Sequence, residues 1–218
     1  TLMRSSAASD VYKRQEYMIQ RTKRMVRRTV WAIQKQLKSG EFEPEGVEVV
    51  FQGGRIDRVD TMETDDGKLY VRVIDYKTGN TSFDLVSLYH GLQLQLMIYM
   101  DGALTVEQNK HKDKDVIPAG VFYYNIKDPM IQEKIDADVE AVSAGLMKEL
   151  KMNGLVQADP ELVYRMDSSL GSIPVAFNKD GSFRKNSSVA DRTQFAVLGR
   201  YVRTKIENCL LYTSDAAD

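Results

Sequence analysis

The segment VIDYKTGN, residues 73–80, ends an apolar strand with two side chains of opposite charge. Asp75 and Lys77 stand two residues apart, and because side chains alternate across a strand, both point to one face, roughly 7 Å apart along it. A carboxylate beside an ammonium is costly at a strand end unless a ligand uses the pair. The segment GRIDRVD, residues 54–60, precedes it and brings Asp57. Together these residues predict a divalent-metal site that cuts phosphodiester bonds.

Each of these residues has a candidate role in that chemistry. Hydrolysis of a phosphodiester needs a deprotonated water, a neutralised transition state and a stabilised leaving oxygen, and Mg²⁺ can serve all three needs. Because Mg²⁺ prefers oxygen ligands and keeps several waters, the carboxylates of Asp57 and Asp75 with the carbonyl of Tyr76 suffice to bind it. Lys77 then stabilises charge on the scissile phosphate or orients the attacking water. The alternative for Asp75 and Lys77 is a surface salt bridge at a strand terminus.

Asp57 and Asp60 compete for the place of the first carboxylate. They are three residues apart in a strand and therefore face opposite sides, so only one of them joins Asp75. We choose Asp57 as the site residue. Asp60 is expected to pair with Arg55 or Arg58.

Gln95 and Tyr99 stand at positions i and i+4 of an expected helix, so they share a face. In the functional interpretation, their polar groups reach the edge of the site or the DNA backbone. In the structural interpretation, Tyr99 is a core aromatic and Gln95 a satisfied buried amide. His90 and His111 are too isolated in the sequence to indicate a histidine metal site.

The composition is that of one soluble globular domain of ordinary size. Apolar residues make up 43% and charged residues 28% of 218, and the formal net charge is −1. The single cysteine excludes an internal disulfide and a cysteine-rich metal site within this chain. The sequence has no apolar run of membrane-spanning length. A reducing compartment is the natural inference, and we expect a cytoplasmic protein.

Positive charge is concentrated in one segment. Residues 13–38 carry nine lysines and arginines against one acid, Glu16. A basic helix there lies along a phosphate backbone or, alternatively, presents a solvated face or docks on an acidic neighbour. Residues 1–15 and 209–218 resemble translated flanking sequence or disordered tails, which leaves residues 16–208 as the functional domain.

Periodicity and turn residues predict an α/β fold, with a small mixed β-sheet flanked by helices. Asp84 is the expected cap of the second of the helices. The expected strands are 47–51, 55–63, 69–76 and 116–126. The expected helices are 16–38, 84–104, 129–153, 159–166 and 192–208, with a polar, turn-rich stretch at 171–190.

These motifs resemble the RecB-type branch of the PD-(D/E)XK nuclease superfamily. Asp57, the triplet Asp75-Tyr76-Lys77 and the spacing from Gln95 to Tyr99 carry the resemblance. Over residues 17–208 the chain is similar to the nuclease domains of AddAB-type helicase–nucleases. The similar segments are GRIDRVD, VIDYKTGN, FDLVSLYHGLQLQLMIYM, PAGVFYYNIKDP and SSVADRTQF.

The resemblance implies a restriction-endonuclease-like core that binds Mg²⁺ and cuts DNA. By matching position it makes Asp57 and Asp75 metal ligands, Lys77 the catalytic lysine, and Gln95 and Tyr99 the motif residues behind the site. It further implies an exonuclease of double-strand break repair by recombination, whose partner in the full-length protein is the other, A-type, helicase–nuclease subunit. The alternative is a catalytically inactive nuclease-fold module that binds DNA or a helicase partner.

Three features depart from the family pattern. The cysteines of the family's iron–sulfur cluster are absent, so no such cluster is expected in this chain. Some members carry a metal-binding histidine before the first strand, whereas no histidine precedes His90 here. The family also predicts a longer hairpin than the eight residues between Glu48 and Asp57, and a deletion there would disturb the first strand and Asp57.

Overall fold

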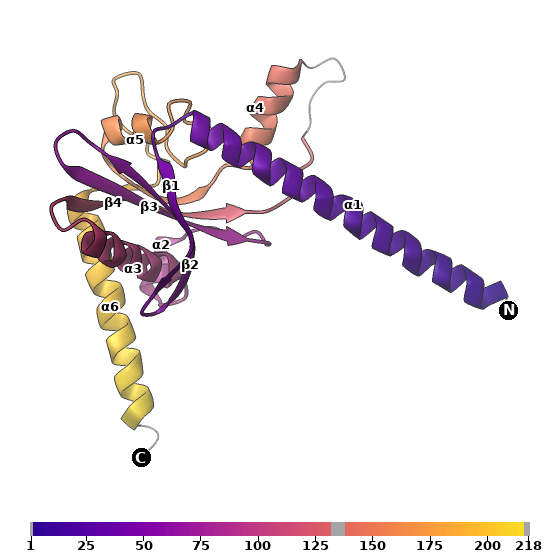
Figure 1. The fold of residues 1–218 in the computed structure, drawn as a ribbon, viewed down its shortest axis with the longest axis horizontal. Helices are drawn as coiled ribbons and strands as arrows, with labels where there is room; N and C mark the ends of the chain where they lie inside the picture. Colours follow the sequence, from indigo (N-terminus) through magenta and orange to yellow (C-terminus); the bar gives the residue numbers. More distant parts are fainter. Residues whose placement is uncertain (1, 132–137, 216–218) are drawn as a thin grey trace.

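The computed structural model describes residues 2–131 and 138–215, with side chains for 11–131 and 138–209. Its centre is one six-stranded mixed sheet in the order β1-β2-β3-β4-β5-β6 (Figure 1). Pairs β3–β4 and β5–β6 are parallel and the other neighbours are antiparallel. The strands are β1 (Glu43–Phe51), β2 (Gly54–Glu63), β3 (Lys68–Lys77), β4 (Asp115–Asn125), β5 (Asn153–Gln157) and β6 (Val189–Ala190).

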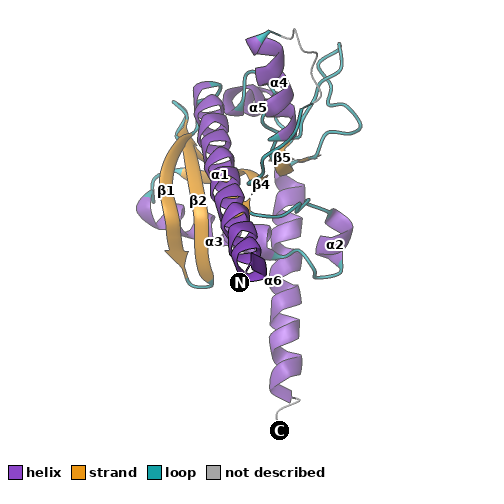
Figure 2. Ribbon diagram, turned by 90° about the vertical axis from the view of Figure 1, so that its right-hand side faces the viewer, coloured by secondary structure: helices purple, strands orange, loops and turns teal. Residues whose placement is uncertain are grey.

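Helices cover both faces of the sheet, which confirms the predicted α/β class. One face carries α1 (Leu2–Lys38), α4 (Val139–Glu149) and α5 (Pro160–Met166). The other carries α2 (Leu85–Tyr89), α3 (Gln95–Lys110) and α6 (Arg192–Asp215). Figure 2 shows the β1–β2 hairpin at one side and α6 running beyond the body of the molecule. Within the described residues, no helix is both long enough and apolar enough to cross a lipid bilayer.

Two apolar layers hold the sheet between these helices. Strand alternation sends Ile74 and Phe122 to the layer beneath α1 and α5, where they meet Ala32 of α1. Their neighbours in sequence point the other way, and Val73 and Tyr123 pack beneath α3 and α6. The catalytic candidates that share the odd-numbered face of β3 therefore lie on the α3 side.

Both terminal helices are longer than predicted. α1 begins at Leu2 rather than at residue 16, and α6 continues to Asp215 rather than ending at 208. The N-terminal segment that we assigned to a tail is thus helical where it is described, because no glycine or proline interrupts the chain before Gly40. The division into a domain at 16–208 with foreign tails stays a prediction.

The helix predicted at 84–104 is wrong as a single element. Asp84 caps α2 as expected, accepting from the N–H groups of Val86 and Ser87. Gly91 then adopts φ +81° and ends the helix, because this left-handed conformation is open to glycine. A second helix, α3, starts at Gln95 and extends to Lys110. The interruption makes Gln95 the first residue of a helix.

The helix predicted at 129–153 is also wrong in extent. Residues 132–137 lie outside the described residues, α4 covers only Val139–Glu149, and Asn153 opens strand β5. Gly154 explains the strand: a Cβ there would stand 1.9 Å from the carbonyl oxygen of Val121, so only glycine lets β5 approach β4. The strand pattern of Leu155 and its neighbours was too short to distinguish from a helix end.

The remaining predicted elements match, and the short hairpin is intact. The strands predicted at 55–63, 69–76 and 116–126 and the helix at 159–166 are displaced by two residues at most. Strand β1 is longer than predicted and pairs with β2 down to a tight turn, where Phe51 stands opposite Gly54. Glu48 has φ +52°, the one irregular position of the ladder beside Asp57. Next to the site, the expected disturbance of the first strand is confined to that residue.

Candidate active site

The candidate catalytic residues meet where β2 separates from β3. These strands pair as far as Arg58 and Ile74, and the next step of the same register sets Asp57 opposite Asp75. Opposite residues of antiparallel strands share a face, with Cβ atoms about 5 Å apart. Beyond this step, β3 continues along β4 and β2 continues along β1. The two carboxylates therefore lie in the fork between diverging strands.

Asp57 is fixed by the main chain of β3. Its Oδ2 accepts a hydrogen bond of 2.8 Å from the N–H of Tyr76. This bond continues the ladder by one step after the main-chain pairing of β2 and β3 has ended. The Asp57 carboxylate is only partly buried, so one side of it remains open to a ligand.

Asp75 lies deeper than Asp57, with 2% of its surface exposed. Burial raises the pKa of Asp75, the nearby ammonium of Lys77 lowers it, and the charge of Asp57 raises it again. Lys77 Nζ lies 2.6 Å from Asp75 Oδ2, an ion pair by distance. This buried oxygen nevertheless has no well-directed hydrogen bond from any described residue. A buried carboxylate in this state favours a further cation beside it.

Lys77 is held at the site by a series of polar contacts. Its Nζ donates to Oε1 of Gln95 at 2.8 Å, and Nε2 of Gln95 donates to the hydroxyl of Tyr99 at 2.7 Å. The structure thus joins Asp75, Lys77, Gln95 and Tyr99 in one connected group. Of the two interpretations of Gln95 and Tyr99, the geometry agrees with the one that places them at the edge of the site.

Two aromatic residues that the sequence did not single out complete this support. Tyr123 pairs with Asp75 across β3 and β4, and its ring lies 5.5 Å from Lys77 Nζ in a cation–π contact. Burial raises the pKa of Tyr123 to about 12, with a smaller contribution from Asp75. Phe51, at the end of β1, meets the ring of Tyr99 edge-on at 5.9 Å. Only the register of the strands identifies them as neighbours of the site.

Asp60 belongs to the opposite face and is fully paired there. It accepts from Arg58 at 2.6 and 2.7 Å and from Arg72 Nε at 2.8 Å. The pairing with Arg58 was predicted and that with Arg72 was missed, because Arg72 lies twelve residues further along the chain. Arg55 instead contacts Glu48 at 3.5 Å. With its charge satisfied and no exposed surface, Asp60 is not available to the site.

The two histidines lie away from the fork, as the sequence indicated. His90 stands at the end of α2, where its N–H donates to the carbonyl of Val86. His111 ends α3 and lies 3.7 Å from the buried carboxylate of Glu107. Each is explained by its place at a helix end.

A family comparison covers this chain almost completely. The model described as "PD-(D/E)XK nuclease superfamily" matches residues 1–217. The chain belongs to this superfamily. The triplet Asp75-Tyr76-Lys77 has the (D/E)XK form from which the superfamily takes its name, and it stands at the strand end described above.

Relatives with this PD-(D/E)XK domain are named as the B-type subunit of an ATP-dependent helicase/deoxyribonuclease. The protein of Lachnoclostridium phytofermentans is 41% identical over 214 residues, which cover 88% of this chain and 18% of that protein. The protein of Acetivibrio thermocellus is 39% identical, with 86% and 18% covered. That of Alkaliphilus metalliredigens is 36% identical, with 89% and 19% covered. The chain therefore spans less than a fifth of the length of the relatives it matches.

The fork has the donor set that a divalent cation of a PD-(D/E)XK nuclease requires. The carboxylates of Asp57 and Asp75 and the carbonyl of Tyr76 are hard oxygen ligands on adjacent strand segments. Asp75 Oδ2, buried and without a directed hydrogen bond, gains a partner if a cation binds there. The described residues contain no group of three or more histidine, cysteine, aspartate or glutamate side chains suited to a metal ion. Water and the main chain must therefore supply the other ligands.

Proposed function

We propose that this chain is a nuclease domain that hydrolyses phosphodiester bonds of DNA with Mg²⁺. The observation that carries the proposal is the position of Lys77, whose ammonium lies between the buried carboxylate of Asp75 and the amide oxygen of Gln95. A lysine placed only for a surface salt bridge has no need of a second, partly buried anchor. Membership of the nuclease superfamily supports the same chemistry.

Asp57, Asp75 and the carbonyl of Tyr76 would hold the metal. When bound, Mg²⁺ supplies charge neutralisation at the phosphate and lowers the pKa of a coordinated water. The hydrogen bond from the Tyr76 N–H orients the Asp57 carboxylate before any ligand arrives. Burial keeps the Asp75 carboxylate poorly solvated, which favours binding of a cation over water.

Lys77 would act directly on the substrate. An ammonium has three N–H donors, and here one is directed at Gln95 while Asp75 lies at ion-pair distance. A donor is left for a non-bridging phosphate oxygen, where negative charge grows in the transition state. Tyr99 and Tyr123 keep Lys77 in this position, Tyr99 through Gln95 and Tyr123 through its ring.

The names of the relatives suggest the biological setting. They indicate DNA as the substrate and a helicase–nuclease built from more than one kind of subunit as the whole enzyme. The partner would then be the A-type helicase–nuclease subunit. We propose that this domain supplies the exonuclease activity of such an enzyme in recombinational repair of double-strand breaks.

Cleavage of labelled single-stranded DNA in Mg²⁺ tests the proposal. The variants are Asp57→Ala, Asp75→Ala and Lys77→Ala, compared with the exposed control residues in Asp113→Ala and Lys112→Ala. We expect each site variant to lose about 10²-fold or more of the cleavage rate, because each removes charge stabilisation of the transition state. The control variants keep the rate of the unmodified chain, and circular dichroism verifies that all five are folded.

Two results would contradict this assignment. Cleavage that survives both Asp75→Ala and Lys77→Ala places the chemistry elsewhere in the chain. An unmodified chain that binds DNA in Mg²⁺ without cutting it supports instead the inactive nuclease-fold module.

A further inference from the structure

A second polar cavity lies far from the fork, on the other face of the sheet. It opens between the C-terminal ends of α1 and α4 and the loop after α5, with a volume of about 700 Å³. Its lining contains four lysines and no carboxylate; we call it the lysine pocket. Its polar residues include Lys35, Lys38, Lys148, Lys151, Ser168 and Ser169. Met147 and Leu170 in its wall pack on the apolar layer beneath α1, whereas Asp75 faces α3.

The lysines of the pocket have no acidic partners among the described residues. Ion pairs there engage other cations of the chain, and Lys35 instead contacts the ring of Trp31, at 6.0 Å. Burial lowers the pKa of Lys151, and the charge of Asp167 only partly opposes this. A partly desolvated ammonium without a carboxylate is costly, so the pocket is built for an anion that comes from outside.

The ends of the helices do not account for this cluster. A cation in the last turn of a helix offsets the helix dipole, which explains one lysine on α1 and Lys148 on α4. Lys35 and Lys38 give α1 two such cations, and Lys151 stands between α4 and β5, outside any helix. The convergence of lysines from three segments on one cavity requires a different reason.

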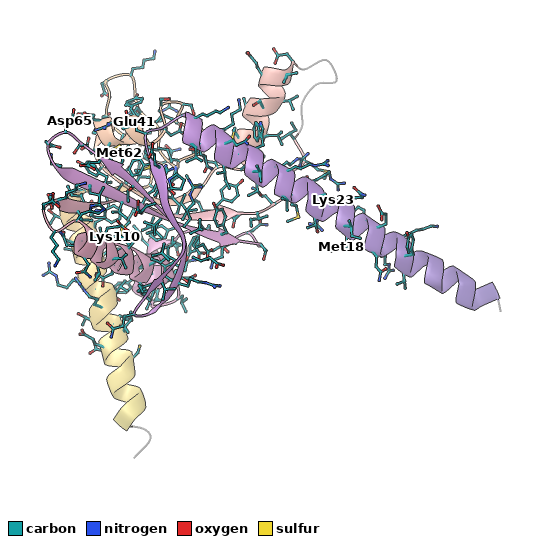
Figure 3. The ribbon with its side chains drawn as sticks, viewed as in Figure 1. Met18, Lys23, Glu41, Met62, Asp65 and Lys110 are labelled. Atoms are coloured by element: carbon teal, nitrogen blue, oxygen red, sulfur yellow. The ribbon has the colours of Figure 1, made fainter. Side chains whose placement is uncertain are left out.

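The same charge continues along the outer side of α1. Lys13, Arg27 and Lys38 are separated by 14 and 11 residues, close to four and three whole helical turns, so they form one row about 37 Å long. Lys13 and Arg27 are exposed, while Arg24 and Arg28 beside the row bind Asp128. Figure 3 shows Lys23 on the part of α1 that extends beyond the sheet. A row of cations that leads into a pocket fits a chain of repeated negative charges.

We propose that the lysine pocket and the outer row of α1 bind the phosphate backbone of a nucleic-acid strand, away from the cutting site. The ligand class rests on the proposed nuclease function, while the anion requirement rests on the pocket itself. The α1 face and the α3 face of the sheet then have separate tasks, since one anchors the strand and the other cuts it. An acidic polypeptide is the rival ligand.

Fluorescence anisotropy of a labelled oligothymidylate of about 20 nucleotides, with the full chain in EDTA, tests the anchor without cleavage. The pocket variant is Lys38→Gln, Lys148→Gln and Lys151→Gln together. The matched control, Lys112→Gln, Lys179→Gln and Lys185→Gln, removes the same charge from exposed positions elsewhere. We expect binding to weaken about tenfold or more in the pocket variant and less than about twofold in the control.

The salt dependence gives an independent measure. Three lost phosphate contacts lower the slope of log affinity against log salt by about 2 for a single strand. Equal losses in both triple variants, or no loss in the pocket variant, overturn the proposal. Competition by polyglutamate as effective as that by unlabelled oligonucleotide, at equal charge, assigns the pocket to an acidic polypeptide. Because nothing is cut in EDTA, failure of the nuclease assignment at Asp75 leaves this binding result intact.

Discussion

Two aspartates three residues apart show how the surroundings of a residue decide its role. Asp60 receives hydrogen bonds from two buried guanidinium groups, so its charge is satisfied within the protein. Asp57 receives one main-chain hydrogen bond and keeps a partly open side. Both are acids of strand β2, and the alternation of side chains sends one to each face. Only the aspartate with spare ligand capacity is suited to a metal ion.

Asp167 offers a test of a purely structural carboxylate. Burial opposes its ionisation, but hydrogen bonds from the hydroxyl and N–H groups of Ser169 and Ser172 outweigh it and lower the pKa. We expect Asp167→Asn to reduce the free energy of unfolding by about 2–4 kcal/mol at pH 7, because several bonds to a charged acceptor are lost. Urea unfolding at a series of pH values measures this.

The pH dependence of that loss follows from the sign of the shift. A lowered folded-state pKa stabilises the fold above the unfolded value, near 3.9, and this stabilisation disappears as the pH falls through the folded value. The difference between wild type and Asp167→Asn should therefore shrink below about pH 4. Asp180, whose carboxylate binds Ser182 in the same way but in solvent, is the control, and Asp180→Asn should change little. A pH-independent difference for Asp167→Asn would contradict this account.

At the scale of elements, the hairpin β1–β2 and helix α3 position the site together. Phe51 ends β1 and packs on Tyr99 of α3, which in turn holds Gln95. The close approach of hairpin and helix needs Gly102, where an added Cβ would stand 2.4 Å from Phe51 Cδ2. The glycine therefore sets the distance at which the hairpin lies on the helix.

Replacing this glycine should separate the two elements. Gly102→Ala forces the ring of Phe51 to move, and we expect a net loss of about 1–3 kcal/mol in the free energy of unfolding. The displaced ring also frees Tyr99, so the cleavage rate should fall with stability. Urea unfolding and the DNA cleavage assay measure the two effects.

Gly199 in α6 provides the matched helical control. A Cβ at Gly199 would meet no atom within 4 Å, so Gly199→Ala removes only a flexible residue from a helix. It should leave stability unchanged or raise it by up to about 1 kcal/mol. If Gly102→Ala proves as harmless as Gly199→Ala, the contact with Phe51 does not position the hairpin.

At the scale of the whole molecule, the sheet separates two polar regions. The fork with Asp57 and Asp75 lies on the side of α3, and the lysine pocket lies on the side of α1. Both regions carry charges that the fold satisfies only in part, one with negative oxygens and the other with ammonium groups. Each therefore loses stability to unpaired charge and regains it when its ligand binds.

Metal binding should thus stabilise the entire domain. A ligand that binds the folded state at 100 times its Kd adds about 2.7 kcal/mol, so Mg²⁺ should raise the Tm of the unmodified chain by several degrees. Asp75→Asn should show little of this increase, because it removes a ligand carboxylate. Differential scanning fluorimetry in EDTA and in Mg²⁺ measures both, with Asp113→Asn as the surface control. An equal increase in Asp75→Asn would place the metal at another site.

The sequence determined the local features of this protein. The apolar run before Asp75, the cap at Asp84 and the turn after Phe51 are short-range signals, and the structure has each of them. Strand alternation was enough to send Asp57 and Asp60 to different faces. The lengths of the terminal helices were missed because composition suggested tails where the backbone continues as a helix.

Only the tertiary structure decided which distant residues meet. The break at Gly91 makes Gln95 the first residue of α3 and brings it to Lys77, although the sequence favoured one continuous helix. Tyr123 reaches Lys77 because β4 pairs in parallel with β3, a register that no local pattern encodes. Local preferences depend on neighbours along the chain, whereas strand register and helix position depend on the packing of the whole core.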